Sequence, residues 1–435
     1  MLDPKFIREN LEEVKEAIRK KRVKVDVEKW LELDEQRKDL QQKLEEKKAK
    51  QNKASAQISQ ASDEEKKKLI EEMGSVKKEA QTIDKKLDKV KTEWQELLMN
   101  IPNICSPDMP EGKDDTENVV IKQVGEKPEF DFGIKDHVEL GTALDIIDIE
   151  TAATVSGSRF FYLKKEAVLI QMAIVNLVFD ILGNEAVIKK IIKENNLNLK
   201  STPFQPILPP VMIRNEIQEK IHRVFGDQTY KIQNEDLNLV ASAEHTLAPY
   251  YINKTLEQKE LPKRYIGYST AFRQEAGTYG KDMGGILRTH QFDKLEMESF
   301  TDVETGAEEQ KLIVALQEYL VQQLNIPYQL VHVCTGDTGK PDYDQYDIEC
   351  WMPAQNKYRE THTSDYMTDY QTRGIKSYYK TKDGKRKLLH TNDATAFAIG
   401  RILIAILENY QQADGSVLIP EVLRKYMGGR EIIGG

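Results

Sequence analysis

The chain has 435 residues, a formal net charge of −9 and 39% hydrophobic residues. This length allows two or three domains with a substantial core, and the negative charge argues against indiscriminate binding to nucleic acids while leaving room for a local basic surface. No stretch of membrane-spanning length is free of charges, and the N-terminal residues MLDPKFIREN lack the apolar region of a signal peptide, so we expect a soluble, cytoplasmic protein without a membrane partner.

Two long stretches in the first hundred residues, 30–58 and 63–98, are dominated by strong helix formers. In the second stretch, apolar residues recur in alternating steps of four and three, as in the seam of a coiled coil. The first stretch keeps the same register, although Arg37, Lys47 and Gln51 interrupt it. Because the joint between them is short, we predict an antiparallel two-helix coiled-coil arm. The apolar series of the second stretch comprises Leu69, Met73, Val76, Ala80, Ile83, Leu87, Val90, Trp94 and Leu97.

Lysines gather toward the predicted tip of this arm. Lys47, Lys48, Lys50 and Lys53 follow Glu46, the last acidic residue of the first helix. A helical arm with basic side chains at its tip suits contact with a phosphate backbone. A solvated charged surface explains the same pattern, so charge alone leaves both readings open.

The composition changes at Asn100, where a run rich in Pro, Asp and Gly begins. We interpret this run as a linker between an N-terminal domain, residues 1–105, and a globular domain, residues 106–435. In the globular domain, strands joined by loops and hairpins alternate with segregated helices, which predicts an α+β fold built on a mainly antiparallel sheet flanked by helices. Helices are predicted at 164–182, 306–324 and 394–408, and strands at 237–242, 328–334 and 346–352.

The stretch 265–300 is predicted to form a strand, a long loop and a returning strand. Alternating residues from Ile266 to Phe272 lead to Arg273 and Glu275, and the loop carries several glycines. If the returning strand is regular, its even-numbered side chains share one face and its odd-numbered ones the other. The first face would carry Arg288, His290, Phe292 and Glu296, and the second Leu287, Leu295 and Met297.

The polar face of this hairpin offers groups that suit a nucleotide and a small polar substrate. A guanidinium suits a phosphate, an aromatic ring suits a base, and a carboxylate suits an amine or a hydroxyl. A surface hairpin with its charges in water fits the same alternation, so the pattern leaves both options open. The chain has neither a Walker-type phosphate loop nor a Rossmann glycine fingerprint, and any ATP must bind by other means.

Four features together resemble the seryl-tRNA synthetases of class II. They are the helical arm and the blocks FRQEAGTYGKDMGGILRTHQFDKLE, YDIECWMPAQNKYRE and HTNDATAFAIGRILIAILENYQQADGSVLIPEVLRKYMGG. The resemblance covers nearly the whole chain in the family's order. It implies a homodimer that forms seryl-adenylate and pyrophosphate from L-serine and ATP and passes the seryl group to the 3′ end of serine tRNA. It also implies that the arm contacts this tRNA through shape and backbone; DNA is not an expected partner.

The resemblance assigns the nucleotide site residue by residue. Arg273 would hold the α-phosphate and the attacking carboxylate, and Glu275 would face the adenine amino group. Phe292 would stack under adenine with Arg401 over its other face. Catalytic roles fall to Arg273, Glu360 and Arg401, and the ATP site would also include Gln274, Thr289, His290, Gln291, Thr361, His362 and Thr363.

A magnesium ion bridging the phosphates would suit this chemistry, because it prefers hard oxygen ligands and substrate phosphates. The resemblance places its protein ligands at Glu360 and Thr363. No zinc is expected, since Cys105, Cys334 and Cys350 are far apart and fit no zinc spacing.

For the amino acid, the resemblance points to Arg273, Glu296 and Thr395 together with Ser242, Ala243 and Glu244. A site that hydrogen-bonds the serine hydroxyl would reject alanine, because its own polar groups would be left unpaired.

Several positions depart from the family's pattern: Asp344 stands for Lys, Asp365 for Ser and Asp393 for Asn, and His362 lies in the metal-binding block. The segment 213–233, IRNEIQEKIHRVFGDQTYKIQ, replaces a Gly-rich run. Two alternatives follow: a paralogue that binds RNA without aminoacylation, or an enzyme that activates an amino acid for a carrier other than tRNA. The presence of all three catalytic residues argues against the first, and the lysine-bearing arm argues against the second.

Overall fold

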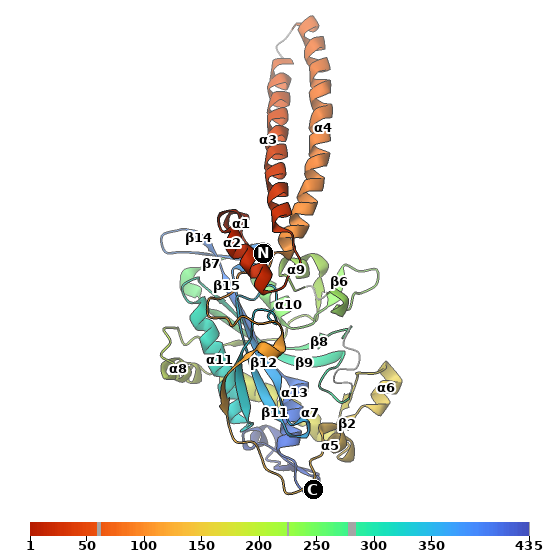
Figure 1. The fold of residues 1–435 in the computed structure, drawn as a ribbon, viewed down its shortest axis with the longest axis vertical. Coiled ribbons are helices and arrows are strands. Elements are labelled where there is room, and N and C mark those ends of the chain that lie inside the picture. The colour runs from red at the N-terminus through yellow and green to blue at the C-terminus, as the bar shows by residue number, and fades with distance from the viewer. Residues whose placement is uncertain (59–61, 224–225, 277–283, 435) are drawn as a thin grey trace. The chain divides into compact units, whose positions relative to one another are not determined.

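A computed structural model describes the chain except for residues 59–61, 224–225, 277–283 and 435 (Figure 1). The described residues divide into two compact units, Met1–Pro102 and Asn103–Gly435.

The first unit consists of two short and two long helices. They are α1 (Pro4–Glu9), α2 (Leu11–Lys20), α3 (Val27–Ile58) and α4 (Asp63–Asn100), and α3 and α4 run antiparallel, side by side (Figure 1). From Leu69 to Trp94, each predicted seam residue of α4 is buried or half-buried, and most of the residues between them are exposed. The predicted coiled-coil arm is thus confirmed.

Two of the three polar interruptions of the first seam, Arg37 and Lys47, have partners within the arm. The Arg37 guanidinium lies 4.7 Å from the centroid of the Trp94 ring, and its Nη2 donates to Asp34 Oδ1 at 2.9 Å. Lys47 Nζ lies 2.5 Å from Glu79 Oε2 on the facing helix. Cation–π contact and ion pairing therefore replace apolar packing at these two positions.

In the described part of the second unit, eight strands form one sheet in the order β1-β10-β11-β12-β15-β9-β8-β4. Neighbouring strands are antiparallel except β4 and β8, which are parallel. This confirms the mainly antiparallel sheet. The bounds are β1 (Val119–Val124), β10 (Tyr328–His332), β11 (Asp344–Met352), β12 (Lys357–Thr368), β15 (His390–Ala398), β9 (Gln291–Thr301), β8 (Lys263–Phe272) and β4 (Gln205–Ile207).

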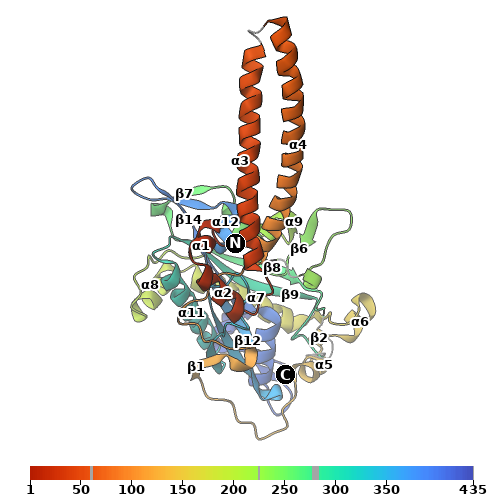
Figure 2. The same ribbon diagram turned by 45° about the horizontal axis from the view of Figure 1, so that its top comes forward.

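Three helices cover one face of this sheet: α7 (Lys165–Leu182), α11 (Gly306–Gln323) and α13 (Ile399–Asn409) (Figure 2). Apolar side chains of alternate strand positions, such as Leu295 and Met297, pack against them in the main core. The alternation predicted for the returning strand is therefore correct at these residues. The opposite face of β9, β12 and β15 carries polar side chains.

Smaller elements surround the sheet. The helices are α5 (His137–Ala143), α6 (Glu150–Ser156), α8 (Glu185–Glu194), α9 (Asn215–Lys220), α10 (Glu244–Leu247), α12 (Tyr370–Ile375) and α14 (Glu421–Arg424). The strands are β2 (Ile147–Asp148), β3 (Tyr162–Leu163), β5 (Met212–Arg214), β6 (Leu237–Leu239), β7 (Thr255–Glu257), β13 (Tyr378–Lys380), β14 (Arg386–Leu388), β16 (Val417–Leu418) and β17 (Ile432–Ile433).

Two sequence-based predictions of secondary structure were wrong in part. The helix predicted at 394–408 begins at Ile399, because residues 394–398 pair with β9 and partly with β12 as the end of β15. Tertiary pairing overrides the helical preference of alanine there. The returning strand begins at Gln291, so Arg288 and His290 precede it and the strand alternation does not place them.

Among the described residues, no single helix combines the length and apolar composition of a membrane span; α7 and α8 reach that composition only as a pair bent by 69°.

Candidate active site

A β-bulge brings Glu360 and Thr363 to the same face of β12. Glu349 of β11 lies opposite Glu360 and Asp347 lies opposite Thr363, and the pairing shifts by one residue between them, at Thr361. In a regular strand, residues three apart point to opposite faces. The extra residue cancels this, so a carboxylate and a hydroxyl three residues apart in sequence face the same side.

The pocket opens where β12 and β15 part. Pairing of the two strands runs from Thr368 only as far as Ser364. Beyond it, Gln317 of α11 donates through Nε2 to the carbonyl oxygens of Thr363, at 2.7 Å, and Thr395, at 2.8 Å. A buried glutamine thus satisfies carbonyls that a regular ladder would have paired, and the strands can separate without orphaned polar groups.

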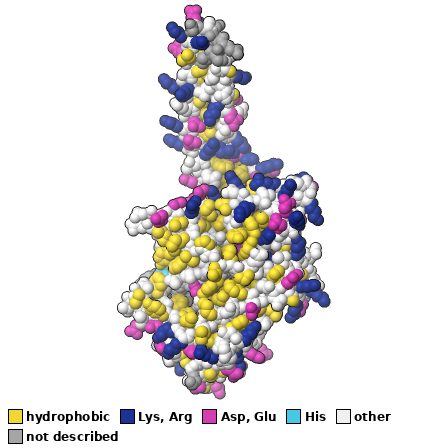
Figure 3. All heavy atoms as spheres, turned by 180° about the vertical axis from the view of Figure 1, so that it is seen from behind, with side chains coloured by type: hydrophobic (Ala, Val, Ile, Leu, Met, Phe, Trp, Pro, Cys, Tyr) yellow, Lys and Arg dark blue, Asp and Glu magenta, His cyan; other side chains and the backbone are white. Residues whose placement is uncertain are grey.

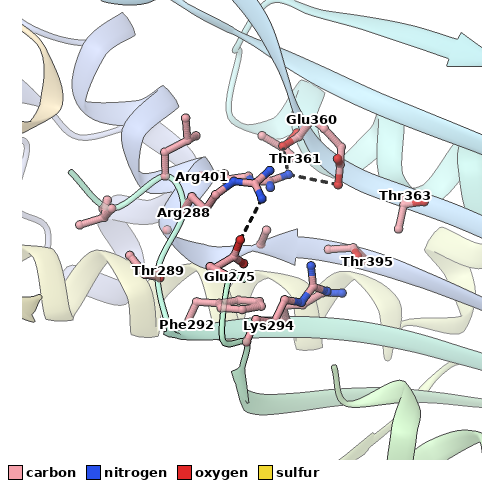
Figure 4. A pocket seen from close by; sticks show the side chains of 15 residues that line it. Glu275, Arg288, Thr289, Phe292, Lys294, Glu360, Thr361, Thr363, Thr395 and Arg401 are labelled. Atoms are coloured by element: carbon pink, nitrogen blue, oxygen red, sulfur yellow. Dashed lines mark hydrogen bonds and ion pairs between the residues drawn. The ribbon is translucent and has the colours of Figure 1, made fainter. Parts of the chain in front are cut away.

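The pocket holds about 640 Å³ of empty space, part of which is open solvent. Its walls come from the end of β8, the segment 286–289, and strands β9, β12 and β15 with the start of α13 (Figure 4). Nine of the residues predicted for the ATP or serine site line it: Arg273, Glu275, Thr289, Phe292, Glu360, Thr361, Thr363, Thr395 and Arg401.

Arg401 and Glu360 form a charged pair at the rim (Figure 4). Arg401 Nη1 lies 3.1 Å from Glu360 Oε1 and donates to the Glu360 carbonyl oxygen at 2.8 Å. Burial acts to raise the pKa of Glu360, but the charges of Arg401, Arg273 and Lys294 outweigh it and hold this pKa below its ordinary value. The Glu360 carboxylate is therefore ionised at neutral pH.

A second charged pair and an aromatic ring form the facing wall. Arg288 Nη1 donates to Glu275 Oε2 at 2.8 Å, so Arg288 orients this carboxylate. The Arg273 guanidinium lies 5.2 Å from the centroid of the Phe292 ring, and its Nε donates to the Ala241 carbonyl oxygen at 3.2 Å. Guanidinium and aromatic groups thus meet at the end of the hairpin, although the guanidinium is that of Arg273 and not that of Arg288, which the alternation had placed beside Phe292.

His137 of α5, which the sequence analysis did not identify, supports the wall at 286–289. The Ile286 backbone N–H donates to His137 Nε2 at 3.2 Å, and His137 Nδ1 lies 3.2 Å from Glu408 Oε1. Gly285 has φ of +78° and lies so close that a Cβ there would be 1.9 Å from Nε2. A Cβ at Gly400 would be 2.9 Å from the Ile286 carbonyl oxygen. The wall at 286–289 therefore depends on two glycines, because a larger residue at either position could not lie so close to its neighbour.

Polar residues predicted for serine meet beside the pocket, and Thr395 also lines it. Lys294 Nζ lies 2.8 Å from Glu296 Oε2 and donates to Ser242 Oγ at 3.4 Å, and Thr395 Oγ1 donates to Glu296 Oε1 at 3.4 Å. Burial raises the pKa of Glu296, against the opposing effect of the Lys294 ammonium. Lys294 was missed in the sequence, although it shares the even-numbered face with Phe292 and Glu296.

Glu244 and Ala243 are buried and do not line the pocket. Glu244 Oε1 accepts from Arg223 Nε at 2.5 Å and from Gln371 Nε2 at 2.7 Å. Arg223 is a third residue that the sequence analysis did not identify, and no local pattern around it indicates its contacts.

Four of the residues predicted for ATP also lie outside the lining. Gln274 Nε2 donates to the Thr229 carbonyl oxygen, and Gln291 lines a neighbouring cavity. His290 Nδ1 lies 3.0 Å from the Arg273 carbonyl oxygen, where it orders the end of the hairpin. His362 is fully buried, with its ring centroid 4.8 Å from that of Phe397.

The residues predicted for magnesium fit such an ion. Glu360 and Thr363 share a face, and Asp347, which was missed because it appears only when the register is known, lies opposite Thr363. Burial and the charge of Glu360 raise the pKa of Asp347. Among the described residues, no group of three His, Cys, Asp or Glu side chains is arranged around a metal position. Magnesium often takes one or two protein carboxylates and completes its shell with water and phosphate.

On the arm, the four predicted lysines differ in environment. Lys48, Lys50 and Lys53 are exposed, whereas Lys47 is held by Glu79. Lys47, Lys50 and Lys53 line a hollow between α3 and α4.

Comparisons with known proteins cover the whole chain. Residues 1–105 match the family described as seryl-tRNA synthetase N-terminal domain, and residues 229–410 match the tRNA synthetase class II core domain (G, H, P, S and T). Proteins named serine–tRNA ligase from Rubrobacter xylanophilus and Borreliella burgdorferi are 39% and 38% identical, with 100% and 98% of this chain and 99% and 98% of theirs covered.

Two solved structures are similar over the full length. Seryl-tRNA synthetase from Pyrococcus horikoshii complexed with ATP has a TM-score of 0.85 and 34% identity, with 100% of this chain and 99% of that chain covered. The cytoplasmic serine-tRNA ligase from Naegleria fowleri in complex with AMP has a TM-score of 0.81 and 27% identity, with 100% and 98% covered.

Burial of His362 should make the free energy of unfolding depend on pH. Burial lowers its pKa to about 3, against about 6.5 in an unfolded chain. The neutral, buried His362 side chain therefore contributes fully to the free energy of unfolding above pH about 6.5. As the pH falls below this value, the unfolded state binds a proton at His362 and the folded state does not. The free energy of unfolding then decreases by up to about 1.4 kcal/mol per pH unit. We expect the free energy of unfolding to fall less steeply from pH 6.5 to 5 in H362Q than in the wild type, as measured by urea denaturation. Equal slopes would contradict a neutral buried His362.

Proposed function

The chain belongs to the seryl-tRNA synthetase family of class II aminoacyl-tRNA synthetases, and we propose that it is a serine–tRNA ligase forming AMP and pyrophosphate. It activates L-serine with ATP to seryl-adenylate and transfers the seryl group to the 3′ end of serine tRNA. The pocket carries this proposal, because Arg273, Phe292, Glu360 and Arg401 come from separate parts of the chain and meet in it. Full-length similarity to serine–tRNA ligases favours this function over the paralogue and the non-tRNA carrier.

ATP is held at both faces of its base and at its phosphates. Adenine stacks on Phe292, and the Arg401 guanidinium covers the other face by cation–π contact. Glu275, oriented by Arg288, accepts from the adenine amino group. Arg273 holds the α-phosphate and the serine carboxylate together, which supplies positioning and stabilises the charge that develops as pyrophosphate leaves.

Magnesium is proposed at the face shared by Glu360 and Thr363, with Asp347 as a further carboxylate opposite Thr363. When bound there, the ion would supply positive charge that offsets the negative charge of the ATP phosphates. Arg401 keeps Glu360 ionised and in place, so the carboxylate is ready to accept a hard cation.

Serine is proposed beside Glu296 and Thr395, with Ser242 and Glu244 near its ammonium. Glu296 and Thr395 lie opposite each other on β9 and β15, so both reach the serine hydroxyl. Alanine would leave these buried polar groups unpaired, which costs far more than the loss of one favourable contact. Threonine is rejected by its extra methyl group.

Residues 1–105 are proposed as the tRNA-binding domain and residues 106–435 as the catalytic domain. The family match of the N-terminal part ends at residue 105, close to the boundary of the compact units. Exposed Lys48, Lys50 and Lys53 would contact the backbone of serine tRNA, and Lys47 would contribute less because Glu79 holds it. We assign the enzyme to the cytoplasm, where translation takes place.

A homodimer is proposed through the apolar surface of the second unit. Val168, Leu169 and Met172 of α7 are 38–39% exposed, and Leu208, which follows the edge strand β4, is 75% exposed. The space-filling view shows broad apolar areas on this unit (Figure 3). Apolar surface of this kind is typical of interfaces between subunits.

Amino-acid-dependent pyrophosphate exchange tests the reaction. We expect exchange with serine to exceed that with threonine, alanine and cysteine, and R273A to reduce it by about 10² or more because charge on the phosphates is no longer stabilised. R386A, which removes an arginine outside the pocket, serves as the control. Exchange with none of the amino acids would refute the enzyme, and a preference for threonine would refute the substrate.

Binding of serine tRNA as a function of salt tests the arm. The triple variant K48Q/K50Q/K53Q should bind more weakly, with a salt slope reduced by about 1 for each lost phosphate contact. K85Q/K86Q/K89Q removes the same charge from exposed positions on α4, away from the tip, and should bind like the wild type. Equal effects of the two triple variants would contradict a tRNA contact at the tip.

Sedimentation velocity tests the dimer. The wild type should sediment as two chains of 50.0 kDa, and M172E should shift toward the monomer because a charge would enter an apolar interface. I70E changes an apolar side chain of the arm that is 58% exposed and should stay dimeric. A monomeric wild type, or an unchanged M172E, would rule out this surface.

A further inference from the structure

Arg223 lies among buried carboxylates next to the proposed serine site. Its Nε donates to Glu244 Oε1 at 2.5 Å, and its Nη2 lies 3.3 Å from Asp342 Oδ1. The same Nη2 lies 3.3 Å from Asp393 Oδ1 and 3.5 Å from Asp365 Oδ2. None of the five side chains is more than 10% exposed, so water screens these charges little.

The register of the sheet places three acidic residues side by side near Arg223. Asp365 of β12 lies opposite Asp393 of β15, which lies opposite Glu298 of β9. Like charges directly opposite each other destabilise a sheet. Glu298 is fully buried, and among the described residues neither of its carboxylate oxygens has a hydrogen-bond partner. Burial raises the pKa of Glu298 well above its ordinary value, which favours its neutral form. Arg223 Nη2 lies within ion-pair distance of the other two acids of this row, Asp365 and Asp393, and offsets their charge.

The acidic row adjoins the proposed serine site. Thr395 lies opposite Glu296 in the next row, two residues along the same two strands from Asp393 and Glu298, which corresponds to about 7 Å. Glu244 connects the acidic row with the proposed serine site. It is assigned to the serine ammonium, and its Oε1 accepts a hydrogen bond from Arg223 Nε.

We propose that Arg223 is a positioning residue for the amino-acid substrate, which holds Glu244 toward the serine ammonium and offsets the acidic row beneath Glu296 and Thr395. This inference rests on the proposed function, because the role of Glu244 comes from it. Arg223 is not among the residues that line the ATP pocket, so it acts on serine rather than on ATP.

The geometry of the guanidinium explains why arginine is used here. Its planar fork directs Nε to Glu244 and Nη2 to three aspartates at once, whereas a lysine ammonium is a single point charge. Arg223 belongs to the segment 213–233, which departs from the family's pattern, as do Asp365 and Asp393. Two of the departing acids, Asp365 and Asp393, thus lie beside an arginine of the departing segment.

Full-length R223Q and R223K test the proposal through the KM values for serine and for ATP in pyrophosphate exchange. We expect the KM for serine to rise about tenfold or more in R223Q, because a charged hydrogen bond to Glu244 is lost. The rise should be smaller in R223K, which keeps the charge, and the KM for ATP should change less than about twofold. Adding D393N to R223Q should restore part of the loss, since it removes one of the repelling carboxylates.

R264K is the matched control, because Arg264 of β8 forms another buried arginine–carboxylate pair, with Nε 2.6 Å from Glu309 Oε1 of α11. An unchanged KM for serine in R223Q would overturn the proposal, as would parallel rises in the KM values for serine and ATP of the kind expected from R264K. If R223Q does not fold, the same two results in R223K, an unchanged KM for serine or parallel rises in the KM values for serine and ATP, would overturn the proposal. A wild type without serine-dependent exchange would instead refute the proposed function, and this inference with it.

Discussion

The register of the antiparallel sheet is the constraint on which the active site depends. Strict alternation would place Glu360 and Thr363 on opposite faces, and only the bulge at Thr361 brings them together. The separation of β12 and β15 then opens space beside them. Gln317 of α11 donates hydrogen bonds to the carbonyl groups that lose their strand partners there, so the separation leaves no unpaired carbonyl at these two positions. A helix of the apolar face thus determines the shape of the polar face.

Charge pairing is the second organising element of this face. Arg401 with Glu360, Arg288 with Glu275 and Lys294 with Glu296 each place a cation beside a carboxylate before any substrate is present. Such pairs contribute little net stability when buried, because desolvation offsets their attraction. Their value is orientation, since side chains that are already fixed need no reorganisation when a phosphate or an ammonium arrives. The Arg223 cluster extends the same arrangement next to the proposed serine site.

Sequence reasoning succeeded where structure is local. The seam from Leu69 to Leu97 follows from helical periodicity, and Phe292 and Glu296 share a face because β9 is regular there. It failed at residues 394–398, where pairing with neighbouring strands overrides the preference of alanine for helix. Glu360 and Thr363 were reached only through family resemblance, because a bulge leaves no readable pattern. Asp347, His137 and Arg223 were missed since their roles depend on contacts between segments far apart in the chain.

A crystal structure of the full chain with a non-hydrolysable analogue of seryl-adenylate would show whether this pocket holds the adenylate. We expect the adenine ring between Phe292 and Arg401, the phosphate mimic at Arg273 and the seryl group between Glu296 and Thr395, with its ammonium toward Glu244. An analogue bound elsewhere, for example in the neighbouring cavity lined by Phe160 and Gln291, would contradict this expectation. So would an analogue in the pocket with its seryl group turned away from Glu296 and Thr395.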